Sequence, residues 1–253
     1  MGETRIIALC GKGGVGKTSV SSLLLKHLAL KKGKKVLAID ADPCAGLAGS
    51  LGIRVKKSVD DIRKDLIAAM GTGRSASDPE TLRMLDYEIF DALSEADGFA
   101  LLSIGRPEDE GCFCRVNSLL KDIIQDLAAG FDYVLIDGEA GIEQINRRVM
   151  KQVHHLVIIS DTSAKGVSVA GTIARVAREN RAVDYHTMGL VLNRVRSEDE
   201  ARDIAAQVSL EMYAWIPEDE SIREFDFQGR PLLGMPGDSP ANLVVQELCG
   251  RLA

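Results

Sequence analysis

Several residue types that define other classes of protein are scarce in this chain. Aromatic residues make up 4% of the 253 residues, so aliphatic side chains must fill the interior. The five cysteines cannot all pair within one chain, and their scatter favours thiols in a reducing cytoplasm over a disulfide framework. The four histidines form no metal-storing tract. These shortages exclude a disulfide-stapled secreted domain and a histidine-rich nickel store.

Long apolar runs and an excess of positive charge are also missing. No uninterrupted apolar stretch reaches membrane-spanning length. The pattern of residues 243–253 predicts an ordinary C-terminal helix, without the basic and aromatic residues of a helix that binds a membrane surface. The chain enters a strand-like segment at once, which we interpret as leaving no room for a signal peptide. The formal net charge of −6 argues against a general nucleic-acid surface. We therefore expect a cytoplasmic protein that binds neither membrane nor nucleic acid.

Apolar, strand-like runs alternate with amphipathic, helix-like segments along the chain. The runs lie at residues 4–10, 35–40, 100–104, 132–137, 156–160 and 188–193, and the amphipathic segments at 59–70, 116–129, 142–152, 167–180 and 200–209. This alternation predicts an α/β fold whose mostly parallel central sheet is flanked by helices on both faces. Residues 55–97 are more helical than the rest, and residues 71–78 resemble a linker, but strands resume on either side. We predict a single domain over residues 1–253 with a helical insertion around 55–97.

A glycine-rich segment follows the first predicted strand and precedes an amphipathic helix. It satisfies the phosphate-loop template Gly-x-x-x-x-Gly-Lys-Ser/Thr in the strand–loop–helix context that such loops require. Glycines allow backbone N–H groups to surround phosphates, and the helix N-terminus adds favourable partial charge. We predict that Lys17 reaches the β- and γ-phosphates and that the Thr18 hydroxyl binds Mg²⁺. The predicted nucleotide-binding residues of this loop are Gly11, Lys12, Gly13, Gly14, Val15, Gly16, Lys17, Thr18 and Ser19.

Polar residues lie at the carboxyl ends of three predicted strands, which is where such sheets bind ligands. Asp40 and Asp42 follow the second strand, Asp137 ends the segment DYVLID, and Asn193 ends the segment GLVLN. Asp137 fits the acidic residue that holds Mg²⁺ through water, opposite Thr18. An aspartate at a strand end can instead cap a helix or form a turn, and for Asp40 both interpretations stay open.

The loop contains a second lysine, Lys12, in addition to Lys17. One lysine suffices for binding phosphates, so Lys12 needs another explanation. It is either a solvated loop side chain or a charge that is donated across a dimer, as an arginine finger is supplied in trans.

The run K-G-G-V-G-K-T at residues 12–18 resembles the deviant Walker A signature of the MinD/ParA/ArsA/nitrogenase-iron-protein class of P-loop NTPases. The segments D-A-D-P at 40–43 and D-G-E-A-G at 137–141 look like the two switches of that class. The resemblance implies a Mg²⁺-dependent ATP hydrolase, in which two protomers face each other with two ATP molecules between them.

The same resemblance assigns roles to individual residues. Lys12 is the signature lysine that contacts the partner's phosphates, Lys17 is the lysine that acts within its own chain, and Asp42 positions the attacking water. Asn193 and Pro217 resemble the adenine-binding positions of the class. These residues complete the expected catalytic and nucleotide-binding set.

Cys112 and Cys114 lie two residues apart in the segment G-C-F-C-R. In an extended segment, residues i and i+2 point to one side, so both sulfurs can reach one ion. Thiolates suit Zn²⁺, Cu(I) or Ni²⁺, but two ligands are too few for a closed tetrahedral site. A twofold dimer brings two such pairs together and supplies four sulfurs. The alternative is two small buried residues that pack as hydrophobes.

The other cysteines and a histidine pair offer no obvious further ligand. Cys10 ends the first predicted strand, Cys44 lies in the first switch, and Cys249 lies in the last helix. His154 and His155 are adjacent on a predicted strand and therefore point to opposite faces. We expect ordinary hydrogen bonding from both rings.

The segment C-F-C-R at 112–115, followed by E-A-G-I-E at 139–143 and by residues 216–233, is similar to CooC-type nickel-insertion ATPases. These serve carbon monoxide dehydrogenase, and close relatives serve acetyl-CoA synthase. The resemblance implies a cytoplasmic metallochaperone that dimerises with ATP and binds Ni²⁺ or Zn²⁺ through Cys112 and Cys114.

Two other functions compete with this interpretation. A reductase similar to the nitrogenase iron protein would carry a bridging cluster, but such a cluster takes cysteines from two well-separated positions in each subunit. A MinD/ParA-like positioning ATPase would bind a membrane or DNA, which the acidic charge and the plain last helix disfavour, and it would leave the cysteine pair unused.

Overall fold

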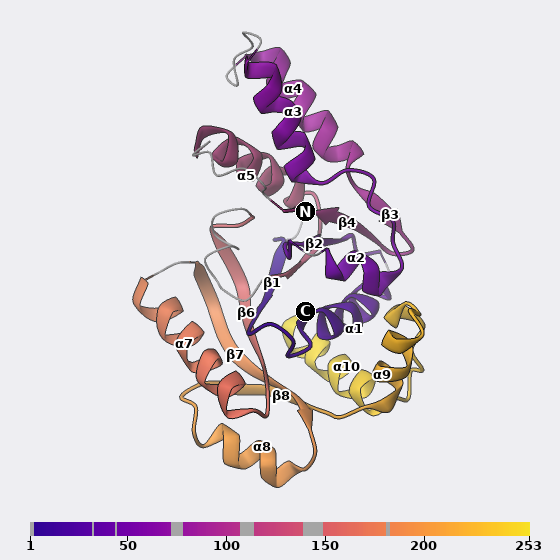
Figure 1. Cartoon of the computed structure of the whole chain (residues 1–253), viewed down its shortest axis with the longest axis vertical. Coiled ribbons are helices and arrows are strands. Elements are labelled where there is room, and N and C mark those ends of the chain that lie inside the picture. Colours follow the sequence, from indigo (N-terminus) through magenta and orange to yellow (C-terminus); the bar gives the residue numbers. More distant parts are fainter. Residues whose placement is uncertain are drawn as a thin grey trace.

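The computed structural model is built around one eight-stranded sheet (Figure 1). It describes residues 3–31, 33–43, 45–71, 78–106, 114–138, 149–180 and 183–253. The strand order is β3-β4-β2-β5-β1-β6-β7-β8, and every neighbouring pair is parallel except β3 and β4. The strands are β1 (Arg5–Cys10), β2 (Val36–Asp40), β3 (Ser94–Ala96), β4 (Phe99–Ser103), β5 (Tyr133–Asp137), β6 (Gln152–Asp161), β7 (Asp184–Val195) and β8 (Glu211–Pro217).

Helices cover both faces of this sheet, as the sequence predicts. One face packs against α1, α2, α9 and α10, and the other packs against α3, α4, α5 and α7. The helices are α1 (Lys17–Ala29), α2 (Gly46–Leu51), α3 (Val59–Gly71), α4 (Pro79–Asp91), α5 (Cys114–Ala128), α7 (Ala164–Asn180), α8 (Glu198–Ala205), α9 (Glu220–Phe227) and α10 (Pro240–Leu252), with a 3₁₀ turn at Leu232–Gly234.

Strand β1 shows why the strands are apolar on both faces. Successive side chains of a strand point to opposite sides, so Ile7 and Leu9 join the core beneath α1 and α10, while Ala8 and Cys10 join the core on the other face. All four side chains are fully buried. A central parallel strand therefore needs an unbroken apolar run, which is the pattern that predicts these strands from sequence.

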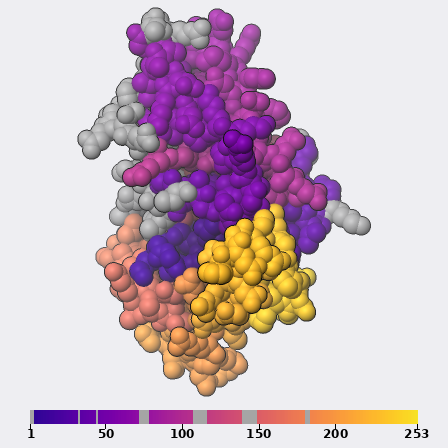
Figure 2. All heavy atoms as spheres, turned by 45° about the vertical axis from the view of Figure 1, so that its right-hand side comes forward, coloured from indigo at the N-terminus to yellow at the C-terminus, as the bar shows by residue number. Residues whose placement is uncertain are grey.

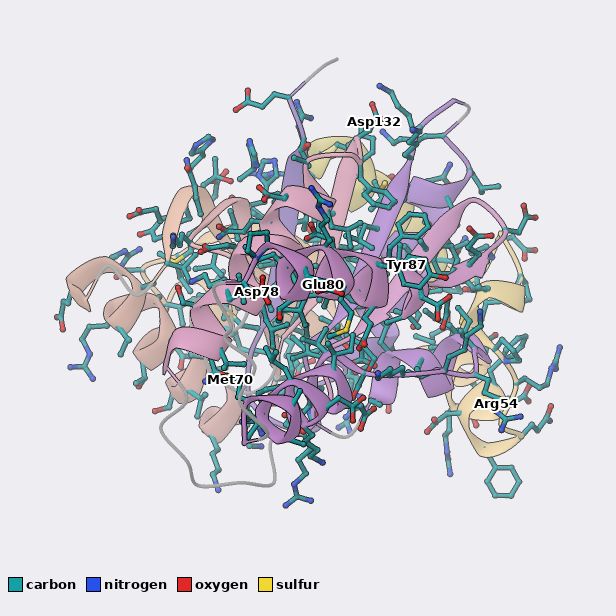
Figure 3. The ribbon with its side chains drawn as sticks, turned by 90° about the horizontal axis from the view of Figure 1, so that it is seen from above. Arg54, Met70, Asp78, Glu80, Tyr87 and Asp132 are labelled. Carbon is teal, nitrogen blue, oxygen red and sulfur yellow. The ribbon has the colours of Figure 1, made fainter. Side chains whose placement is uncertain are left out.

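The predicted insertion around 55–97 contains α3, α4 and the edge strand β3. Both helices project from the sheet beside α5 and pack their buried faces against it (Figure 1). Figure 3 views this region from above, with Met70 near the end of α3 and Glu80 and Tyr87 on α4. Asp78 caps α4 by accepting a hydrogen bond from the Glu80 N–H at 3.4 Å. Residues 72–77 of the predicted linker lie outside the described residues.

Three sequence expectations need correction or extension. Strands β3 and β8 were not predicted, because both lie at edges of the sheet and carry mixed polar and apolar side chains. The predicted helix at 142–152 is wrong at its carboxyl end, where Gln152 is the first residue of β6; residues 142–148 lie outside the described part of the chain. The remaining predicted strands and helices coincide with observed ones to within a few residues.

Helix α1, near the start of the chain, is held by contacts with the C-terminal segments. Helix α10 packs along α1, so the yellow C-terminal segments lie against the indigo N-terminal ones in Figure 2. His27 and Asn242 join the two helices through an Nε2–Oδ1 contact of 3.1 Å, and the Lys26 ammonium donates to the carbonyl of Met235. Since α1 begins at the phosphate-loop lysine Lys17, this packing fixes the helix whose N-terminus faces the candidate site.

Among the described residues, no helix combines the length and the apolar character needed to cross a membrane.

Truncation of a buried side chain on α1 should destabilise the protein strongly. Leu24 is 0% exposed, whereas Leu30, at the end of the same helix, is 71% exposed. We expect Leu24→Ala to lower the free energy of unfolding by about 3 kcal/mol through lost burial and a residual cavity. The matched substitution Leu30→Ala should change it by less than about 0.5 kcal/mol. Urea unfolding followed by circular dichroism measures both, and equal effects would contradict this account of the core.

Candidate active site

The segment between β1 and α1 forms a loop whose close packing requires glycine at two positions. Gly11 has φ of +151°, and a Cβ there would lie 2.1 Å from the carbonyl oxygen of Ile159. Gly16 has φ of +94°, and a Cβ there would lie 2.2 Å from Nδ2 of Asn193. Any larger residue would collide with β6 or β7, so these two glycines set the path of the loop.

Lys17 is the first residue of α1, and its side chain folds back over the loop. Its ammonium donates to the backbone carbonyl of Lys12 at 3.3 Å, and only 7% of the residue is exposed. A buried ammonium needs anionic or strongly polar neighbours, because desolvating an isolated charge is costly. Its placement at the N-terminus of α1, beside loop amides, gives the site two sources of positive potential.

Asp137 ends β5 and lies against the first turn of α1. Its carboxylate accepts hydrogen bonds from the hydroxyls of Thr18 and Ser21, each at 2.9 Å. Burial raises the pKa of Asp137 to about 6, against the opposing effects of the two hydroxyls and of the Lys17 charge. Hydroxyl and carboxylate oxygens are the ligand types that Mg²⁺ prefers, so the pair of Thr18 and Asp137 fits such an ion.

Asp40 ends β2 and binds backbone groups of the segment that follows. Its carboxylate accepts from the N–H of Asp42 at 3.3 Å and from the N–H of Ala48 at 3.2 Å. Burial raises the pKa of Asp40 to about 7. The sequence left a structural and a functional interpretation of Asp40 open. These contacts give Asp40 the structural role, because its carboxylate holds the first turn of α2.

The segment after Asp40 contains a strained residue. Ala45 has φ of +50° at the start of α2, and its N–H donates to the carbonyl of Asp42 at 3.0 Å. A left-handed conformation is unfavourable for alanine, so the neighbouring contacts must hold it. Asp42 itself is half-buried and lies beside the Asp40 carboxylate.

Asn193, near the end of β7, contacts the loop directly. Its Nδ2 donates to the carbonyl of Val15 at 2.8 Å, and the residue is 5% exposed. The predicted adenine-binding residue Pro217 ends the adjacent strand β8, where it pairs with Val195. The structure thus brings Asn193 to the loop and places Pro217 on the neighbouring strand end.

Arg194 is a contact residue that the sequence analysis missed. Its Nη1 donates to the carbonyl of Gly14 at 3.1 Å, and its backbone is left-handed with φ of +59°. The one sequence signal was an arginine directly after Asn193. Its backbone conformation depends on a shift in the pairing of β7 with β8, which a single sequence does not reveal.

The predicted metal ligands are described only in part. Cys112 lies outside the described residues, and Cys114 is described only as the first residue of α5. Cys44 also lies outside the described residues. Cys10 and Cys249 are buried free thiols, and burial raises the pKa of Cys10 to about 12. Within the described part of the chain, no three His, Cys, Asp or Glu side chains form a group suited to hold a metal ion.

The histidine pair makes the ordinary hydrogen bonds that we expected. The backbone N–H of Ile6 donates to Nδ1 of His154 at 3.0 Å, while Nδ1 of His155 contacts the Thr187 hydroxyl at 2.8 Å. The two rings therefore have separate partners.

This geometry agrees with comparisons with known proteins. Residues 6–232 match the family described as the CobQ/CobB/MinD/ParA nucleotide binding domain. The chain belongs to this family. It is a P-loop ATPase, as its loop and sheet predict.

Sequence relatives of this ATPase include an ATP-binding protein and an accessory protein of carbon monoxide dehydrogenase. An uncharacterized ATP-binding protein of Methanocaldococcus jannaschii is 36% identical over 249 residues, which cover 98% of each chain. The carbon monoxide dehydrogenase accessory protein CooC of Rhodospirillum rubrum is 29% identical over 234 residues, which cover 88% of this chain and 87% of CooC.

Solved structures share the fold of this ATPase. The cell division protein MinD of Aquifex aeolicus superposes with a TM-score of 0.70 at 22% identity, covering 98% of this chain and 96% of MinD. MinD of Pyrococcus horikoshii in complex with Mg-ADP gives a TM-score of 0.67 at 22% identity, with 98% and 96% covered. These likenesses confirm the mostly parallel α/β architecture.

The buried carboxylate of Asp137 should make the nucleotide-free ATPase less stable as the pH rises. Its pKa of about 6 exceeds its ordinary value of 3.8, so the folded state holds the proton more tightly than the unfolded state does. The resulting contribution to stability is present below about pH 4 and is lost as the pH rises through 6.

We therefore expect Asp137→Asn to raise the free energy of unfolding at pH 8 by on the order of 1–3 kcal/mol. The asparagine can keep contact with both hydroxyls, since these also accept hydrogen bonds. Urea titrations without Mg²⁺ or nucleotide measure the free energy of unfolding at each pH. The difference between the variant and the parent protein should vanish toward pH 4. Asp132 (Figure 3) is the control: hydrogen bonds from the Lys35 N–H and the Lys34 ammonium lower its pKa, so Asp132→Asn should not stabilise the protein at pH 8. An Asp137→Asn variant that is less stable at pH 8 would contradict the argument.

Proposed function

We propose that this ATPase is a metallochaperone of the CooC type, acting as one domain over residues 1–253. It dimerises with Mg-ATP, binds Ni²⁺ or Zn²⁺ through Cys112 and Cys114, and delivers nickel to a carbon monoxide dehydrogenase or an acetyl-CoA synthase. The observation that carries this proposal is the Cys-x-Cys pair, present in a chain that is 29% identical to CooC over nearly all of both sequences.

The nucleotide binds, in this proposal, along the loop from Gly11 to Ser19. Backbone amides and the Lys17 ammonium hold the phosphates, supported by the position of Lys17 over the loop. Thr18 and Asp137, whose side chains are hydrogen-bonded at 2.9 Å, would hold Mg²⁺, with Asp137 acting through water. When bound, Mg²⁺ neutralises the charge that develops on the β- and γ-phosphate oxygens.

The remaining site residues supply the base contact and the chemistry. Asn193 lies near the end of β7 and Pro217 ends β8, and in this proposal the two residues flank the adenine. Asp42 positions the attacking water from the segment that follows β2. Lys12 extends toward the partner protomer and compensates the negative charge on its nucleotide.

The metal cargo binds at the twofold axis of the dimer. Two thiolates from each protomer give the four sulfur ligands that a closed tetrahedral site requires. ATP favours the closed dimer because it binds across the interface, and hydrolysis removes that stabilisation. The spacing of the two cysteine pairs then changes with the nucleotide, and the ion is released to the client.

Lys12→Ala tests the role of the second lysine. We expect the variant to bind ATP with an affinity within a few-fold of the parent protein, but to form no ATP-dependent dimer and to lose at least about 100-fold in turnover. Light scattering after size exclusion, with a non-hydrolysable analogue, and a phosphate-release assay measure the two properties.

The matched control is Lys34→Ala. Lys34 precedes β2 and pairs with Asp132. Both residues lie at the N-terminal ends of the parallel strands, whereas the loop lies at the C-terminal ends. The Lys34→Ala variant should dimerise and hydrolyse ATP as the parent protein does. Parental turnover by Lys12→Ala would remove the trans role from the mechanism.

Replacing both Cys112 and Cys114 with serine tests the cargo site. We expect the parent protein to bind one Ni²⁺ or Zn²⁺ per dimer and the double variant to bind none, while ATP affinity is unchanged. Anaerobic titration followed by native mass measurement, with and without a non-hydrolysable ATP analogue, gives the stoichiometry. Cys249→Ala, at a buried thiol of α10, should keep the metal.

Two outcomes would overturn the cargo proposal. Metal retained by the double variant would place the ion elsewhere. A brown protein with visible absorption would instead indicate an iron–sulfur cluster and the reductase function.

A further inference from the structure

Arg194 holds a backbone conformation that arginine rarely adopts. Its φ of +59° lies in the left-handed region, and Ala45 is the other non-glycine residue with positive φ among those the structure describes. Arg194 sits where the pairing of β7 with β8 shifts between Asn193 and Val195. Strain of this kind persists where surrounding contacts impose it, and such contacts cluster at functional sites.

The strained turn directs two consecutive side chains at two consecutive carbonyls of the phosphate loop. Nη1 of Arg194 donates to the carbonyl of Gly14 at 3.1 Å, and Nδ2 of Asn193 donates to the carbonyl of Val15 at 2.8 Å. In an ordinary strand, adjacent side chains point to opposite faces, so both could not reach one loop. The left-handed residue at 194 breaks that alternation.

The planarity of the peptide bond converts these two contacts into an orientation of the loop amides. In a trans peptide unit, the C=O of one residue and the N–H of the next point in opposite directions. Holding the carbonyls of Gly14 and Val15 toward β7 therefore turns the N–H groups of Val15 and Gly16 away from β7. A phosphate loop binds its ligand through such amides.

We propose that Arg194 is a positioning residue that orients the loop amides for the phosphates of the nucleotide. The inference rests on the proposed function in one respect, namely that the loop from Gly11 to Ser19 holds those phosphates. Arg194 acts through the loop and touches the nucleotide at no point in this proposal. Its positive charge also strengthens the hydrogen bond to the Gly14 carbonyl and polarises the attached N–H group.

The proposal explains why a strained arginine occupies a position that glycine would adopt without strain. Glycine would relax the backbone but would leave the Gly14 carbonyl without its cationic donor. Arg194→Gly should therefore raise the stability of the protein and weaken its binding of phosphates. A residue with a purely structural role would change both in the same direction.

Three substitutions at this position, Arg194→Ala, Arg194→Gly and Arg194→Lys, test the proposal. Calorimetry gives the dissociation constants for Mg-ATP, Mg-ADP and adenosine at low salt. We expect Arg194→Ala and Arg194→Gly to weaken Mg-ATP binding about tenfold and to leave adenosine binding unchanged, because the loop amides contact phosphates only. Arg194→Lys keeps the charge without the planar fork and should recover part of the loss.

Two further measurements accompany the binding constants. The thermal midpoint of nucleotide-free Arg194→Gly should exceed that of the parent protein, since glycine is relaxed at this φ. In hydrolysis, KM should rise about tenfold while kcat changes less. Arg202→Ala, which removes an exposed arginine of α8 that pairs with Glu198, controls for the loss of one positive charge and should match the parent protein.

The possible failures are distinguishable. Parental ATP affinity in Arg194→Ala would overturn the positioning role, and so would an equal loss of ATP and adenosine binding, which would indicate a direct contact with the base. A fall in both thermal midpoint and ATP affinity in Arg194→Gly would indicate a merely structural residue. If the parent protein itself bound no ATP through the loop, with Lys17→Ala unchanged from it, the proposed function would fail as well.

Discussion

The contact between the Asp137 carboxylate and the hydroxyls of Thr18 and Ser21 is the interaction on which the rest of the site depends. It joins the end of β5 to the first turn of α1, two elements separated by more than 100 positions in the chain. The loop between β1 and α1 is consequently anchored at its far end to the sheet. With Gly11 packed against Ile159 at its near end, the loop has little freedom to change path.

This arrangement stores unfavourable electrostatic energy in the nucleotide-free protein. Strands β2 and β5 are paired in a register that sets Asp40 beside Asp137, and both residues are fully buried. Burial raises the pKa of each carboxyl, and the Asp137 charge raises the pKa of Asp40 further. A cation bound there, as the proposed function has it, would relieve this repulsion, so the sheet register that makes the nucleotide-free protein less stable would also favour binding of Mg²⁺.

Local patterns in the sequence were sufficient for the centre of the sheet and the phosphate loop, because those features depend on short-range signals. Buried parallel strands need unbroken apolar runs, and the loop needs glycine at fixed positions. Edge strands β3 and β8 lack that constraint, since each has a partner strand on one side only among the residues that the structure describes, and their composition is mixed. Arg194 was missed for another reason: its left-handed turn follows from a shift between β7 and β8, which is a property of the folded sheet.

Family membership explains ATP hydrolysis but leaves open what the hydrolysis drives, and the sheet topology bears on that question. Strand β4 lies beside β2, and the N–H of Ile104, just after β4, donates to the backbone carbonyl of Asp40 at 2.9 Å. The chain that leaves this point runs on to Cys112 and then to Cys114 at the start of α5. The Asp40 carboxylate also accepts hydrogen bonds from the N–H groups of Asp42 and Ala48. Asp40 thus contacts Asp42 and Ala48, in the segment that resembles a switch, and Ile104, just after β4. In the proposed function, a displacement of the segment after β2 on nucleotide binding would act on the end of β4 through Asp40, which is the kind of link that a nucleotide-controlled metal site requires.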